Sequence, residues 1–158
     1  MATIETLYQS AKTLPVPDEK AAQEFEHLHL ELAEALNKKI DTRPDLEKLV
    51  GKNNVEMMHN NARNMTRFLA SLFHSFEPQV LADTVIWVFT AYRSHGFHVT
   101  YWAANLDNFS GLLKEKCTEH TLGQVLPVVN WMITNIPAFT LISDEKLKNP
   151  EYTPPPDH

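Results

Sequence analysis

A continuous helical pattern over residues 53–76 restricts the possible folds of this chain more than any other feature of its sequence. Apolar side chains recur there every three or four residues, which is the spacing of one face of an α-helix and not of a β-strand. Glu77 and Pro78 follow and begin the next helix, because proline in the first turn gives up no hydrogen bond. We therefore expect two consecutive helices that meet at a short corner. The stripe consists of Met58, Ala62, Met65, Leu69, Leu72 and Phe76.

The same periodicity continues on both sides of this pair, and no segment alternates like a strand. Asp18 is expected to cap a long early helix, and Gly96 to end a later one in the left-handed conformation. The predicted fold is all-α with about six or seven helices, either an up-down bundle or a globin-like arrangement. The expected helices cover residues 3–14, 18–40, 53–76, 77–96, 99–116 and 122–134, with a last apolar turn that ends at residue 142.

No linker interrupts this pattern, which indicates one helical domain over residues 18–143. Residues 1–17 are expected to form a short N-terminal helical extension. Residues 144–158 include several prolines and are expected to be a disordered tail.

Composition narrows the class of protein. The net charge of −6 over 158 residues argues against nucleic acid or an anionic membrane as a partner. The single cysteine, Cys117, excludes an internal disulfide and favours a reducing compartment. No apolar run approaches the roughly 18 residues of a membrane span, and no signal-peptide pattern opens the chain. We expect a soluble cytoplasmic protein.

Residues 57–83 align without a gap with the pigment-binding segment of phycobiliproteins. Those proteins have a Cys-Leu-Arg-Asp motif that attaches a linear tetrapyrrole, an Arg-aromatic pair on the same helix, and a Gly-Asp-x-x-Val-Leu-x-Asp corner. At the aligned positions this chain has Met58-His59-Asn60-Asn61, then Arg67-Phe68, and then Phe-Glu-Pro-Gln-Val-Leu-Ala-Asp over residues 76–83.

The chain therefore resembles the phycobiliprotein-related globin-like family, and within it the globins associated with bilin biosynthesis. The resemblance implies a globin-like fold and a bound bilin, either biliverdin or a phycocyanobilin-like linear tetrapyrrole. Met58 stands where the family has its attaching cysteine, so the pigment is expected to be bound non-covalently. The implied role is that of a carrier, a sensor or a partner in bilin metabolism.

The resemblance also suggests roles for particular residues. Asn61 aligns with the aspartate that faces the pyrrole nitrogens and offers a carbonyl acceptor without charge. His59 could take the same role, since its charge changes near neutral pH. Arg63 is a candidate clamp for a propionate. The expected bilin-binding residues are Met58, His59, Asn60, Asn61, Arg63, Trp87 and Tyr92.

Three other interpretations remain open at this point. The fold could be a regulatory or interaction module without a ligand. It could bind haem through Tyr92, four residues before Gly96, where globins have their proximal ligand. It could hold two metals, since Glu24-x-x-His27 and Glu56-x-x-His59 match a bundle motif, although helix geometry turns both mostly outward. No motif indicates an enzyme.

The resemblance further implies a homodimer, because phycobiliprotein folds pair through their early helices and the outer face of the pigment helix. Arg67 lies opposite Met58 on that helix and is expected to meet Asp18 or Glu24 of a second chain. Bilin-synthesising enzymes are the other expected partners.

Overall fold

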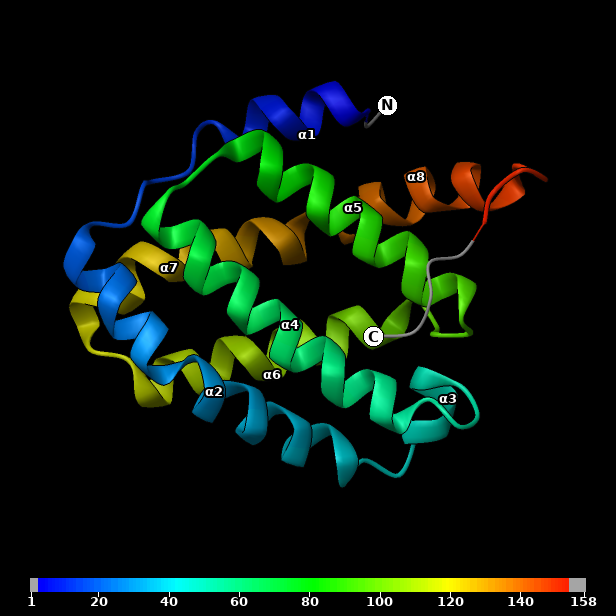
Figure 1. The fold of residues 1–158 in the computed structure, drawn as a ribbon, viewed down its shortest axis with the longest axis horizontal. Coiled ribbons are helices and arrows are strands. Elements are labelled where there is room, and N and C mark those ends of the chain that lie inside the picture. Colours follow the sequence, from blue (N-terminus) through cyan, green and yellow to red (C-terminus); the bar gives the residue numbers. More distant parts are fainter. Residues whose placement is uncertain (1–2, 154–158) are drawn as a thin grey trace.

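The computed structural model describes residues 3–153, and within that range the chain is all-helical, with no strand (Figure 1). The predicted all-α class is confirmed. The helices are α1 (Ile4–Ala11), α2 (Glu19–Asp41), α3 (Leu46–Val50), α4 (Val55–His74), α5 (Pro78–Ser94), α6 (Thr100–Lys116), α7 (Glu119–Thr134) and α8 (Ile136–Lys148).

Local sequence signals set most helix starts. The Asp18 carboxylate accepts a hydrogen bond of 2.8 Å from the Ala21 N–H, so the predicted cap of α2 is confirmed. This backbone hydrogen bond, together with one from Gln124, lowers the pKa of Asp18. Pro78 lies in the first turn of α5, and Gly96 has a φ of 102° after that helix, both as expected.

The most extensive helix contact joins α2 and α4, which lie side by side in Figure 1. Phe25 of α2 is fully buried at this contact, with its ring edge-to-face against Phe73 of α4 at 4.9 Å and Phe109 of α6 at 6.4 Å. On the surface, His59 binds Asp41 and His74 binds Glu26 across the same two helices. α4 therefore contacts α2 both through a buried aromatic ring and through two polar pairs at the surface.

The early turn α3 was not expected from the sequence. It ends at Gly51, where a Cβ atom would lie 2.9 Å from the Gly96 carbonyl oxygen. Glycine is therefore required at this contact between two loops. The Asn54 side chain closes the contact, since its Nδ2 donates to the carbonyls of Val50 at 2.8 Å and His95 at 2.7 Å.

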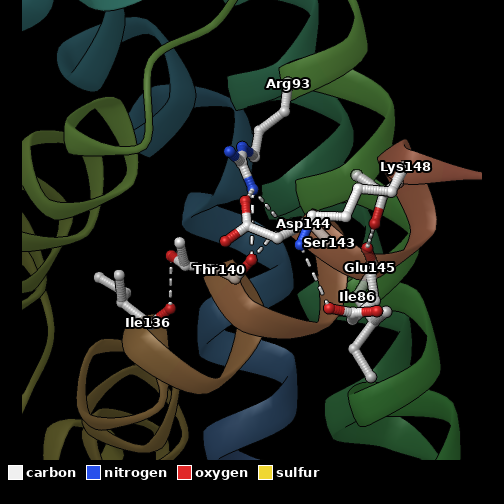
Figure 2. A network of polar contacts seen from close by, with 9 residues as sticks. Ile86, Arg93, Ile136, Thr140, Ser143, Asp144, Glu145 and Lys148 are labelled. Atoms are coloured by element: carbon white, nitrogen blue, oxygen red, sulfur yellow. Dashed lines mark hydrogen bonds and ion pairs between the residues drawn. The ribbon is translucent and has the colours of Figure 1, made fainter.

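The C-terminal helix extends further than the sequence indicated. We expected a disordered tail from residue 144, but α8 continues to Lys148. The beginning of this segment is bound to the rest of the domain, since Arg93 of α5 reaches α8 and donates to Ser143 Oγ at 2.6 Å and to Asp144 Oδ1 at 2.7 Å (Figure 2). The expected disorder of the last five residues, 154–158, falls outside the described part of the chain.

Among residues 3–153, no single helix has the length and apolar composition of a membrane span. Only α7 and α8 taken together, with a bend of 51° between them, meet that criterion of length and composition.

Candidate ligand-binding cavity

A cavity of about 180 Å³ lies between α4 and α5. A short turn joins these two consecutive helices (Figure 1). Helices α6, α7 and α8 each contribute at least one side chain to the inner walls of the cavity. Trp87 of α5 lines it as well and is 47% exposed. The larger apolar side chains in its lining include Phe68, Trp87, Phe89, Trp102, Met132 and Phe139.

The described residues that line the cavity carry no formal charge. They include no Asp, Glu, Lys, Arg or His, and the polar ones are Asn61, Asn64, Thr84 and Tyr92, besides the indole N–H groups. A charged group placed inside would lose its hydration without gaining an ionic partner. The enclosed space therefore suits an uncharged, apolar or aromatic group.

A buried polar cluster adjoins this apolar space. Asn61 of α4 is 2% exposed, and its Nδ2 donates to the Tyr101 hydroxyl oxygen at 3.0 Å. Asn105 of α6 donates to the same oxygen, also at 3.0 Å. Burial raises the pKa of Tyr101, so the hydroxyl stays neutral at physiological pH. Asn61 thus belongs both to the cavity wall and to a rigid core network.

Trp102, which also belongs to the wall, contains a buried polar group without a partner. Its ring stacks on Phe89 with centroids 5.0 Å apart and is 4% exposed. Its indole N–H is buried and has no acceptor within residues 3–153. A buried donor without an acceptor costs about 1–3 kcal/mol, so this group is unusual in a folded core.

The structure brings together only some of the residues expected to bind a bilin. Asn61, Trp87 and Tyr92 line the cavity. Met58 is 1% exposed and packs in the core about one turn before the cavity begins. Asn60 accepts a hydrogen bond from the Arg63 guanidinium, and neither residue is in the lining.

His59 faces away from the cavity. Its Nε2 lies 2.7 Å and 2.9 Å from the two carboxylate oxygens of Asp41 on α2. Successive residues of a helix are turned by about 100°, so the step from Met58 to His59 moves the side chain to the α2 side. His59 therefore does not line this cavity, and its contact with the pyrrole nitrogens stays a prediction.

Several cavity residues were not expected from the sequence. Four of them come from four different helices, and the helical pattern of the sequence does not distinguish them from ordinary core side chains. They are Phe89, Trp102, Met132 and Phe139. Only the unpartnered N–H distinguishes Trp102 from an ordinary core aromatic, and a sequence does not reveal it.

The two Glu-x-x-His motifs do not meet. The Glu24 carboxylate accepts from the Thr118 hydroxyl at 2.8 Å, and His59 binds Asp41. Within residues 3–153, no three His, Cys, Asp or Glu side chains are grouped closely enough to hold a metal ion. Burial, and next the charge of Glu24, raise the pKa of Cys117 to about 11, so its thiol is protonated at neutral pH.

The acidic groups expected to meet Arg67 of a second chain have partners in their own chain. Asp18 Oδ2 lies 2.8 Å from His120 Nε2 and accepts from Gln124 at 3.0 Å, and Glu24 accepts from the hydroxyl of Thr118, the N-cap residue of α7. Arg67 itself is exposed. The homodimer stays a prediction, but Asp18 and Glu24 are engaged elsewhere.

A comparison of this chain with models of protein families, with curated proteins and with solved structures found no match.

Proposed function

We propose that this protein is a globin-like relative of the phycobiliproteins that binds a linear tetrapyrrole non-covalently, as a carrier, a sensor or a partner in bilin metabolism. The observation that carries the proposal is the neutral, aromatic-walled cavity between α4 and α5. These are the two helices whose sequences align with the pigment-binding segment. Asn61, the residue aligned with the family's pyrrole-facing aspartate, lines that cavity.

The size of the cavity limits how such a ligand would bind. At about 180 Å³ it is slightly larger than the cavity of about 150 Å³ that accepts benzene in an engineered core, and smaller than a typical drug-sized pocket of about 300–1,000 Å³. One or two rings of a tetrapyrrole fit inside. The remaining rings would extend past Trp87, and the propionates would stay in water, because none of residues 3–153 contributes a cationic side chain to the lining.

Titration with biliverdin and with phycocyanobilin tests the proposal. We expect saturable one-to-one binding, seen as a shifted and intensified long-wavelength absorption band, because walls of aromatic side chains hold part of the pigment in one conformation. The same titration of the protein unfolded in guanidinium chloride is the control. If neither pigment changes its spectrum with folded protein, the fold is a module without a bilin ligand.

Haem is the second candidate, because Tyr92 lines the cavity and a tyrosine oxygen can ligate haem iron. The rigid planar macrocycle of haem, in which methine bridges join four pyrrole rings, needs a wider space than this cavity provides, which favours the flexible linear pigment. Titration with hemin distinguishes the two: a sharp Soret band that is lost in Tyr92→Phe would support haem.

A bound bilin is expected to leave the protein completely on denaturation. Met58 offers no thiol, and Cys117 is half-buried, protonated at neutral pH, and outside the cavity lining. On a denaturing gel, zinc-induced fluorescence should therefore run ahead of the polypeptide. Fluorescence that follows the polypeptide in the original chain and disappears in Cys117→Ser would contradict this prediction.

A further inference from the structure

A second space adjoins the cavity at Trp87. It is a groove of about 370 Å³ between α1, α5 and the C-terminal segment that begins with the end of α8. Trp87 lines both the cavity and the groove, so a ligand too long for the cavity can continue along this side chain into the groove. The groove lining includes Asp83 and Thr90 of α5, Lys146 of α8, and Asn149 and Tyr152, which follow α8.

The groove differs from the cavity because it carries charged side chains. Lys146 contributes an ammonium group to the groove, whereas none of the described residues that line the cavity is charged. Asp83 also lines the groove, and its carboxylate accepts a hydrogen bond from the Tyr8 hydroxyl of α1. The groove thus contains one cation and one anion, and the anion is hydrogen-bonded to α1.

Lys146 forms no ion pair with another of residues 3–153, although the charges around it on α8 are paired. Asp144 accepts from Arg93 at 2.7 Å, and the Lys148 ammonium lies 3.5 Å from the Glu145 carboxylate (Figure 2). The Lys146 side chain is exposed and has no such partner in the described part of the chain. An ammonium group beside an apolar cavity is a suitable partner for the carboxylate of a largely apolar ligand.

We propose that one propionate of the bilin pairs with the Lys146 ammonium in the groove, while one end of the pigment lies in the cavity. This inference rests on the proposed function and makes it more specific. The two propionates of a bilin are on its middle rings, so a pigment with one or two rings inside the cavity has a propionate close to Trp87. Because Lys146 is exposed, the paired carboxylate keeps part of its hydration and avoids the cost of full burial.

Biliverdin and its dimethyl ester test the ion pair, because esterification removes both negative charges and keeps the ring system. Lys146→Glu should weaken the binding of biliverdin about tenfold, since a repulsion replaces an attraction at a solvent-exposed site. The same variant should bind the dimethyl ester as tightly as the original chain does. Absorption titrations of both proteins with both pigments, at low ionic strength, measure the four affinities.

Lys148→Glu is the matched control for this substitution. Lys148 is an exposed lysine on the same helix, but it lines neither the groove nor the cavity. Its replacement changes the net charge by the same amount and should leave both affinities unchanged. Lys146→Arg should keep most of the affinity for biliverdin, because the positive charge is retained. All three substitutions are at exposed positions of α8, so the variants should fold like the original chain.

A second measurement needs no variant. Sodium chloride at about 0.5 M should weaken the binding of biliverdin about threefold and should not weaken that of the dimethyl ester, because salt screens exposed charges. Equal losses for the two pigments in Lys146→Glu, or equal losses of biliverdin affinity in Lys146→Glu and Lys148→Glu, would overturn the ion pair and leave the bilin proposal standing. If neither pigment binds the original chain, the bilin proposal itself is refuted, and the ion pair with it.

Discussion

Val88→Trp is expected to weaken the binding of a bilin about 100-fold. Val88 lies on α5 and lines the cavity, and an indole in its place would occupy much of the about 180 Å³ that the ligand needs. Exclusion of one buried ring removes about 2–3 kcal/mol of apolar contact, which corresponds to about 100-fold weaker binding. Titration of the variant with biliverdin by absorption spectroscopy measures this loss.

Leu30→Trp is the matched control for this substitution. Leu30 lies on α2, is 55% exposed and does not line the cavity, so the same residue type added there should leave the affinity unchanged. Cooperative unfolding of both variants should be verified by circular dichroism, since overpacking costs about 1–3 kcal/mol. Undiminished binding by folded Val88→Trp would place the ligand somewhere else on the protein.

Phe25→Ala is expected to be the most destabilising single change in the α2–α4 contact. The ring is fully buried and touches Phe73 and Phe109 edge-to-face, so its removal leaves a cavity between three helices. Truncation of a buried phenylalanine costs about 3–5 kcal/mol of unfolding free energy. In a protein of this size the melting temperature falls by about 2–4 °C for each kcal/mol.

Urea denaturation of Phe25→Ala and of Leu30→Ala separates packing from helix propensity. Both substitutions put alanine on α2, but Leu30 is mostly exposed, so its replacement should change the unfolding free energy by less than about 0.5 kcal/mol. Equal losses in the two variants would mean that burial of the Phe25 ring does not stabilise the α2–α4 contact.

Helix positions were largely predictable because their signals are local. The cap at Asp18, the first-turn Pro78 and the left-handed Gly96 act within a few residues of the helix end that they define. The extension of α8 to Lys148 was not predictable in this way. This part of α8 binds Arg93 through Ser143 and Asp144, and Arg93 is about fifty residues earlier in the chain, so the contact is not visible in the local sequence.

The candidate site was predictable only in part. Asn61, Trp87 and Tyr92 were expected and line the cavity, whereas His59 was expected and binds Asp41. A helical pattern shows which face of α4 is apolar, but His59 lies at the edge of that face. Whether an edge residue meets a ligand or a neighbouring helix depends on where α2 crosses α4.

The sequence by itself therefore determined the all-helical class, most helix ends and the apolar face of each long helix, because these properties follow from backbone hydrogen bonding and side-chain spacing over a few residues. Only the tertiary structure decided which side chains surround the cavity and that the Trp102 N–H has no acceptor among the described residues. Trp102, Met132 and Phe139 join Asn61 from three other helices. The crossing positions of those helices result from close packing of the whole core, which no local segment encodes.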